Sequence, residues 1–186
     1  MWIRRSPVRA SRLGPGEVIV MLGGSGEGVE RARDLLDCFA KTSFHLGPWG
    51  AGAQMKLISN LVLGLNRAAL AEGLSLARNV GLDLQQTLEV LKAGMSYSRI
   101  METKGEKMRL RDYTPQAKLA QHLKDVELIR AEGTRLGMPL PFSGLHAEIL
   151  SSLVAQGLGD LDNSAIQEFF HPEDSREQKS LEEKPE

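Results

Sequence analysis

One long helical segment, predicted over residues 51–80, restricts the possible folds of this chain more than any other feature. The nine residues after Lys56, L-I-S-N-L-V-L-G-L, are apolar around most of a helix surface, so we expect burial on nearly all sides. Gly81 ends the segment, as glycine commonly does at helix C-termini. Other elements have to cover such a helix, and the rest of the sequence indicates which they are.

The segments after Gly81 are predicted to be helical as well, which makes the fold class mainly α. Asp83 is placed to cap the next helix. Thr114 and Pro115 combine an N-cap with a proline at the first helical position, which is a strong start signal. Apolar residues then recur at three-and-four spacing up to Leu136. The predicted helices cover residues 84–92, 96–110, 114–136, 143–156 and a short stretch after Asp162.

A short β-α-β unit precedes the long helix. A strand is predicted over residues 17–22 and a second extended segment over 42–46, with an amphipathic helix over 29–40 between them. A complete nucleotide-binding sheet needs several such units. We therefore interpret residues 1–46 as a remnant of a dinucleotide-binding domain, residues 47–170 as a helical domain, and residues 171–186 as a disordered tail poor in apolar side chains.

The glycine loop of this unit, G-G-S-G-E-G, has the spacing G-x-G-x-G rather than the dinucleotide-binding G-x-G-x-x-G. Glu27 and Glu30 would also repel a phosphate, so a tight turn is the favoured interpretation. The four histidines lack metal-ligand spacing and are interpreted as surface or satisfied side chains, and no metal is expected. Cys38 lies on the apolar side of its helix and is predicted to be buried.

Composition excludes several classes of function. The formal net charge of −1 over 186 residues provides no basic surface for nucleic acid or an anionic membrane. The apolar runs are too short to span a bilayer. A single cysteine allows no internal disulfide, which fits the cytoplasm. The Arg-rich N-terminus has the composition of a mitochondrial presequence, but Pro7 would interrupt the helix that such a signal needs, so the mitochondrial matrix is the less favoured compartment.

The stretch G-P-W-G-A-G-A-Q-M-K-L-I-S-N, residues 47–60, carries the candidate chemistry. Lys56 falls in the first turns of the long helix, where both burial and the positive end of the helix dipole favour the neutral amine. The sequence therefore suggests a proton-transferring lysine beside an anion site, or alternatively a lysine whose stem packs on the core. The polar stripe, as we call one predicted face of this helix, consists of Lys56, Ser59, Asn60, Gly64 and Arg67.

These residues resemble the β-hydroxyacid dehydrogenase family, of the 3-hydroxyisobutyrate dehydrogenase and 2-hydroxy-3-oxopropionate reductase type. The family signature G-x-x-G-x-G-x-x-x-K-x-x-x-N is matched at every fixed position by residues 47–60. Similarity continues through E-G-L-S-L-A-R-N-V-G-L-D, G-M-S-Y-S, L-K-D and G-D-L-D-N-S-A, in that order along the chain. The resemblance implies a helical catalytic and dimerisation domain like the C-terminal domain of 6-phosphogluconate dehydrogenase.

The resemblance also implies roles for individual residues. Lys56 would be the catalytic acid/base, and Gly52, Ser59 and Asn60 would bind the substrate. Lys124 would contact the cofactor, which would be NAD or NADP. The partner would be a small hydroxy acid, and we expect a homo-oligomer because the long apolar helix needs a cover.

Three departures from the family pattern leave two hypotheses open. The N-terminal G-x-G-x-x-G is absent, the substrate-binding D-A-P-V-S-G-G corresponds only to residues 6–11, and Ala117 replaces a frequent aromatic residue. The first hypothesis is a dehydrogenase whose chain is truncated and is expected to be inactive when alone. The second is a non-catalytic paralogue that acts as a helical oligomerisation or binding module.

Overall fold

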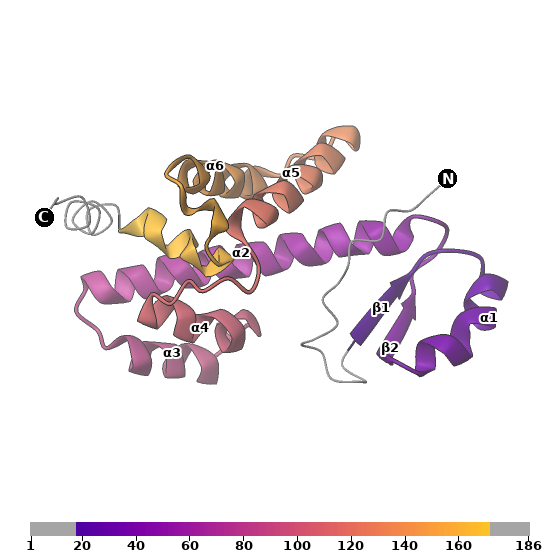
Figure 1. Ribbon diagram of the computed structural model, residues 1–186, viewed down its shortest axis with the longest axis horizontal. Helices are drawn as coiled ribbons and strands as arrows, with labels where there is room; N and C mark the ends of the chain where they lie inside the picture. Colours follow the sequence, from indigo (N-terminus) through magenta and orange to yellow (C-terminus); the bar gives the residue numbers. More distant parts are fainter. Residues whose placement is uncertain (1–17, 172–186) are drawn as a thin grey trace, which may run out of the picture. The chain divides into compact units, whose positions relative to one another are not determined.

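The computed structural model describes residues 18–171, which form two compact units on either side of the Ile58–Ser59 bond (Figure 1). Each unit is described by itself. The presequence-like N-terminus, the segment 6–11 and residues 172–186 of the expected disordered tail lie outside the described residues. His171, the first residue of that expected tail, is described and buried. The structure is mostly helical, which confirms the predicted fold class. Within residues 18–171 no helix is both long and apolar enough to cross a membrane.

The first unit contains the predicted β-α-β arrangement. It consists of β1 (Val18–Leu22), α1 (Gly26–Asp37), β2 (Ala40–His45) and the beginning of α2. The two strands pair in parallel, with α1 as the crossover. Ser25 caps α1 by accepting a hydrogen bond from the Gly28 N–H at 3.2 Å, so this helix begins three residues before the predicted position 29. Cys38, which follows the last residue of α1, is exposed, so the prediction of its burial was wrong; α1 itself has no buried residue.

The second unit is helical. It contains most of α2 (Ala51–Asn79), followed by α3 (Leu84–Ala93), α4 (Ile100–Leu110), α5 (Leu119–Arg135), α6 (Pro141–Ala155), and the 3-10 helices η1 (Leu158–Asp160) and η2 (Asn163–Phe170). Helix α2 runs without a break over nearly the predicted residues 51–80. Asp83 caps α3 as predicted, because its side chain accepts from the Gln86 N–H at 2.8 Å.

The core of this unit lies between the second half of α2 and the helices that follow it. Its fully buried side chains include Leu74 of α2, Leu88, Met108, Leu119, Leu150 and Ile166. Burial of α2 begins at Gly64, because the described helices of this unit cover the helix only from there onward. Met55, Ile58, Val62 and Leu63 are 37–55% exposed, so the expectation of burial on nearly all sides was wrong for the first half of α2.

The predicted helix start at Thr114 and Pro115 was also wrong, since α5 begins at Leu119. The N–H groups of Gln116 and Ala117 donate to the Asp162 carboxylate at 2.8 and 3.2 Å, which holds this stretch outside the helix. Thr114 bonds to the Asp112 side chain instead of capping α5. A buried carboxylate 46 residues further along the chain therefore overrides a strong local signal.

Asp162 joins three parts of the second unit. It is fully buried and accepts from the Lys104 ammonium at 2.8 and 2.9 Å. It also caps η2 by accepting from the Ser164 N–H at 3.1 Å. Burial alone would raise the pKa of Asp162, but these donors outweigh it and bring the pKa down to about 2. The carboxylate therefore fixes α4, the segment before α5 and η2 to one another.

Candidate functional site

The glycine-rich segment before α2 packs closely against the end of β1. The Gly24 N–H donates to the Gly47 carbonyl at 2.9 Å, and Gly50 adopts a φ of 96°, which favours glycine. A Cβ on Gly52 would lie 2.5 Å from the Met21 carbonyl oxygen. The close approach of helix and strand therefore accounts for glycine at 52, while the substrate-binding role of Gly52 remains a prediction.

The start of the polar stripe lies on an accessible part of α2. Lys56 is exposed, so the expected burial of this lysine is not found, while Ser59 and Asn60 are half-buried. Because α2 is one continuous helix, residues three and four positions apart lie on the same face. The helix thus presents Lys56, Ser59 and Asn60 along a single face. Its first turn contains no acidic residue, and the Ala51 N–H at its start donates to the Pro48 carbonyl at 3.1 Å.

Asn60 is joined to the neighbouring helix α5. Its Nδ2 donates to Oδ2 of Asp125 at 3.5 Å, and both side chains are half-buried. Lys124, the predicted cofactor contact, is the adjacent residue on α5 and is exposed. The second unit therefore brings Asn60 and Asp125 together, with Lys124 next to them in sequence. Lys56 belongs to the first unit and is placed here only through its position on α2.

The inner end of the polar stripe is buried and faces two histidines. Gly64 and Arg67 are both buried, and Arg67 is only 2% exposed. His122 of α5 and His146 of α6 are 6% and 3% exposed, and their ring centroids lie 5.0 Å apart. A Cβ on Gly64 would lie 2.9 Å from atoms of both rings. Glycine at this position therefore lets the two imidazoles approach α2.

Burial determines the charges in this region. Burial, followed by the charge of Arg67, lowers the pKa of His122 to about 3 and that of His146 to about 4, so both rings are neutral at pH 7. Burial also lowers the pKa of Arg67 to about 10, which still leaves the guanidinium charged. The inner end of the stripe thus combines one buried cation with two neutral imidazoles.

The buried histidines contradict the interpretation of all four histidines as surface or satisfied side chains. Nε2 of His122 and Nε2 of His146 have no hydrogen-bond partner among the described residues. A sequence signal for them exists. His122 falls within the buried series of α5, between Leu119 and Val126, and His146 falls between Ser143 and Leu150 in α6. A histidine within an apolar stripe was therefore the indication of burial.

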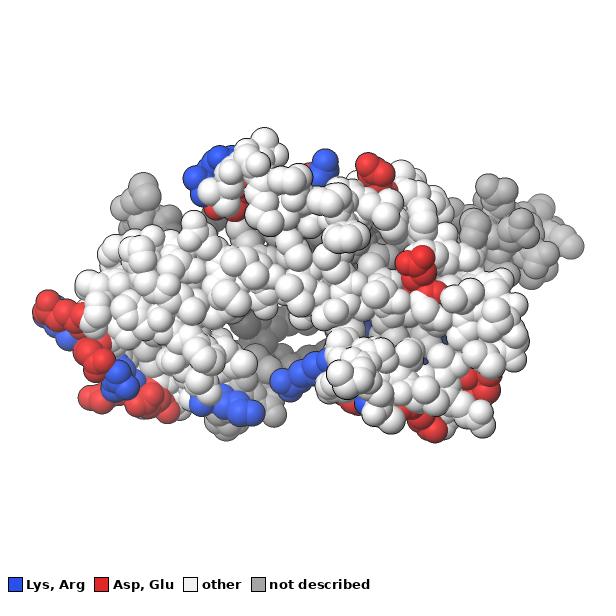
Figure 2. All heavy atoms as spheres, turned by 180° about the vertical axis from the view of Figure 1, so that it is seen from behind, with Lys and Arg blue, Asp and Glu red and all other residues white. Residues whose placement is uncertain are grey.

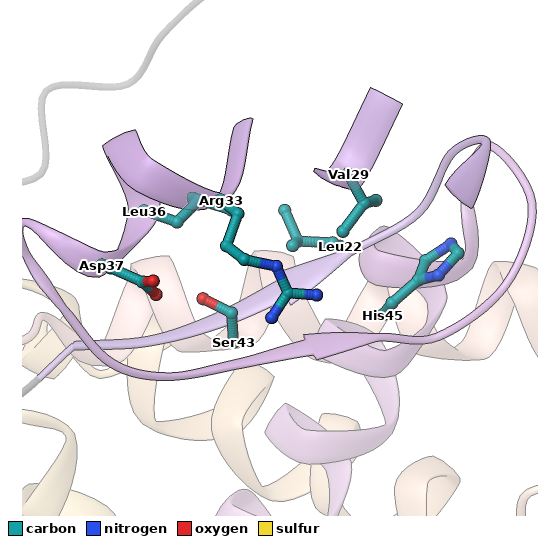
Figure 3. A pocket seen from close by; sticks show the side chains of 7 residues that line it. All are labelled: Leu22, Val29, Arg33, Leu36, Asp37, Ser43 and His45. Carbon is teal, nitrogen blue, oxygen red and sulfur yellow. The ribbon is translucent and has the colours of Figure 1, made fainter. Parts of the chain in front are cut away.

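The first unit contains a small pocket of about 160 Å³ between α1 and the sheet (Figure 3). Arg33 extends across it from α1, and Ser43 and His45 line it from β2 (Figure 3). Two nitrogens of Arg33 already donate to Glu30, and Nε2 of His45 lies 2.9 Å from the Gly24 carbonyl oxygen. Arg33 and His45 are therefore already partnered. Residues 18–171 contain no group of three potential metal ligands.

A dinucleotide fits the described residues only in part. At the N-terminus of α1, the Ser25 side chain occupies the Gly28 N–H, and Glu27 stands in the first turn, so this loop does not suit a pyrophosphate. The exposed ammonium of Lys124 can donate to a cofactor oxygen. Within residues 18–171, Lys124 thus remains the predicted cofactor contact, and the loop before α1 provides no pyrophosphate cradle.

Comparison with known proteins identifies the class of protein to which the chain belongs. Residues 50–170 match the family model described as the NAD-binding domain of NADP-dependent 3-hydroxyisobutyrate dehydrogenase, which places the chain among the NAD(P)-dependent oxidoreductases. The match covers well over half of the chain and includes the complete polar stripe. The chain belongs to the 3-hydroxyisobutyrate dehydrogenase family, as the motifs predicted.

The relatives agree with this assignment. Glyoxylate/succinic semialdehyde reductase 1 of Arabidopsis thaliana is 34% identical over 81% of this chain and 52% of its own length. The 2-hydroxy-3-oxopropionate reductase of Escherichia coli is 31% identical over 87% of this chain and 56% of its own. The crystal structure of 3-hydroxyisobutyrate dehydrogenase from Salmonella typhimurium has a TM-score of 0.74 at 28% identity, covering 78% of this chain and 52% of that one. The chain therefore spans about half the length of these relatives.

Proposed function

We propose that this chain supplies the helical part of an NAD(P)-dependent oxidoreductase that acts on a small hydroxy acid, with Lys56 as the acid/base. The observation that carries the proposal is the continuous helix α2, which presents Lys56 and Asn60 on one face. The names of the relatives, among them 2-hydroxy-3-oxopropionate reductase, support the substrate class. The bound nicotinamide would supply or accept the hydride.

Each residue has a distinct part in this proposal. The Lys56 ammonium would donate its proton to the substrate oxygen during reduction, and the amine would take it back during oxidation. The absence of acidic residues from the first turn of α2 supports a carboxylate on the substrate, because helix N-termini attract anions. Ser59 would hydrogen-bond the same substrate from the adjacent position of the stripe, and Lys124 would contact the cofactor.

Asn60 would be held in position by Asp125. The hydrogen bond between them uses one of the two N–H groups of the Asn60 amide and fixes the direction of its Oδ1. The remaining N–H and Oδ1 could then bond to substrate oxygens without a conformational search. Because both side chains are half-buried, this contact lies at the boundary between solvent and the packed interior.

The test uses the enzyme in which this chain is joined to a dinucleotide-binding domain. Lys56→Ala should lower kcat by about 10²–10⁴, the usual range for loss of a general acid/base, with little effect on cofactor affinity. Lys41→Ala, which removes another exposed lysine, should retain activity. Full activity of Lys56→Ala would remove the catalytic role. The 186-residue chain by itself should bind NADH weakly in a fluorescence titration, and tight binding would contradict the partial fit described above.

A second candidate function is assembly through the helical unit. The exposed apolar side chains of α2 favour it, since a contiguous apolar surface is commonly covered in an oligomer. On the face in Figure 2, broad parts of the described surface carry neither acidic nor basic side chains. We propose that a second copy of the chain covers this apolar part of α2. The cytoplasm remains the proposed compartment.

A further inference from the structure

We propose that Arg67, His122 and His146 form a buried binding site for one small monovalent anion such as chloride. The site lies within the helical unit, where α2, α5 and α6 each contribute one of these side chains. It lies at the buried inner end of the polar stripe, whereas the proposed catalytic residues lie at its accessible outer end, where Lys56 is exposed. The proposal does not depend on the proposed enzymatic function.

The first argument is the unpartnered guanidinium. Arg67 is 2% exposed, and neither Nε nor Nη1 has a hydrogen-bond partner among the described residues. A buried cation without a counter-charge or hydrogen bonds is strongly unfavourable. Nε2 of His122 and Nε2 of His146 lack partners in the same way. Three side chains from three helices thus carry unused polar atoms in one buried region.

The second argument concerns the charge balance. Among the described residues, Asp162 is the carboxylate whose charge acts on Arg67. Each of its oxygens already accepts three hydrogen bonds, counting one from the Lys104 ammonium on each. Asp162 therefore neutralises Lys104 and has no acceptor capacity left for Arg67. With neutral histidines, the buried groups Arg67, Lys104 and Asp162 retain a net charge of +1.

The third argument concerns the size of the ligand. His122 and His146 are 6% and 3% exposed, so the region is closed to a bulky ligand or to a side chain from another molecule. The rings approach α2 so closely that a Cβ on Gly64 would lie 2.9 Å from both. A monatomic anion suits an enclosed region lined by N–H donors. Each imidazole can present its N–H to such an ion by choosing the appropriate tautomer.

Anion binding should also be linked to proton uptake. Burial and the charge of Arg67 disfavour a proton on both imidazoles, and His146 adds to this effect at His122. An anion between them would compensate this repulsion, so a protonated histidine would hold the ion more tightly. We therefore expect the anion affinity to rise as the pH falls toward the histidine pKa values, which a bound anion would raise from about 3 and about 4.

The test compares thermal unfolding of the 186-residue chain in sodium chloride and in sodium gluconate, each at about 0.1 M ionic strength. Gluconate is too bulky for the site. Chloride at ten times its dissociation constant at about pH 7.5 should raise Tm by about 3–6 °C, and the same chloride concentration should raise it by more at about pH 5.5. The response should vanish in Arg67→Met and persist in Arg78→Met, which alters a less buried arginine of the same helix.

Equal Tm values in the two salts, or a chloride response that persists in Arg67→Met, would overturn the proposal. If Arg67→Met does not fold, bromide-soaked crystals of the unaltered chain decide the matter. An anomalous peak beside the Arg67 guanidinium supports the site. Bromide found only on the surface, or only where a second copy contacts the chain, refutes it.

Discussion

Replacing Gly64 by alanine tests how tightly the two histidines are packed against α2. The added Cβ would lie 2.9 Å from Cε1 and Nε2 of His122 and from Cε1 of His146. Both rings are buried, so neither can move into solvent. Overpacking of this kind costs about 1–3 kcal/mol, and we expect the upper part of that range because two side chains have to shift.

The matched control is Gly73→Ala on the same helix. A Cβ there meets no atom within 4 Å, and the position is exposed. Both substitutions gain the helix propensity of alanine over glycine, about 0.8–1 kcal/mol, so the difference between the two variants isolates the steric cost. We expect Gly73→Ala to be stabilised by roughly that amount. Gly64→Ala should be less stable than Gly73→Ala by about 2–3 kcal/mol.

Urea unfolding followed by circular dichroism at 222 nm measures this difference through the helical unit. Both tryptophans precede residue 50, so their fluorescence would not report on that unit. The difference corresponds to about 4–12 °C in Tm for a chain of this size. In a His146→Ala background, Gly64→Ala should cause a smaller loss of stability, because one of the two rings that the new Cβ meets is removed. Equal stability of the two glycine variants would refute the described packing of the rings.

Three further predictions follow from the buried charges and the exposed apolar surface. The pKa values of His122 and His146, about 3 and about 4, lie below the ordinary histidine value of about 6.5. The contribution of the neutral rings to the free energy of unfolding is therefore fully present above about pH 6.5 and is lost as the pH falls below it. In chloride-free buffer, unfolding free energy should drop by about 2–4 kcal/mol from pH 7 to about pH 5; a flat profile would show that the rings are not buried. Asp162→Asn leaves the Lys104 ammonium buried without its counter-charge and should cost about 3–5 kcal/mol in urea unfolding. A loss below about 1 kcal/mol would indicate an exposed pair. Sedimentation at tens of micromolar should show self-association through the exposed part of α2, and a monodisperse monomer would count against it.

The sequence predicted the parts of the fold that depend on local signals. Helix α2 was located to within a residue at its end because Gly81 adopts a φ of 81°, which terminates the helix. Asp83 was recognised as a cap because its hydrogen bond reaches only three residues along the chain. Such features depend on neighbouring residues and can therefore be inferred from one sequence.

Features that depend on distant residues were missed. The prediction of a helix start at Thr114 and Pro115 was wrong because the N–H groups of Gln116 and Ala117 donate to Asp162, which is distant in the sequence. His122 and His146 were interpreted as surface or satisfied side chains, because the meeting of α5 and α6 over α2 is not encoded in either helix alone. The polar stripe was predicted from helical periodicity, but its division into an accessible outer end and a buried inner end required the packing.

The position of Asp162 in the chain has a consequence for folding during synthesis. Lys104 is made 58 residues before the carboxylate that receives its charge. At a rate of synthesis of about 5–20 residues per second, Asp162 is added to the chain about 3–12 s after Lys104. During that interval α4 cannot bury Lys104 without leaving a charge uncompensated, so its docking should be delayed. The helical unit is therefore expected to complete its packing late, after the segment that follows α6 has been synthesised and Asp162 can pair with Lys104.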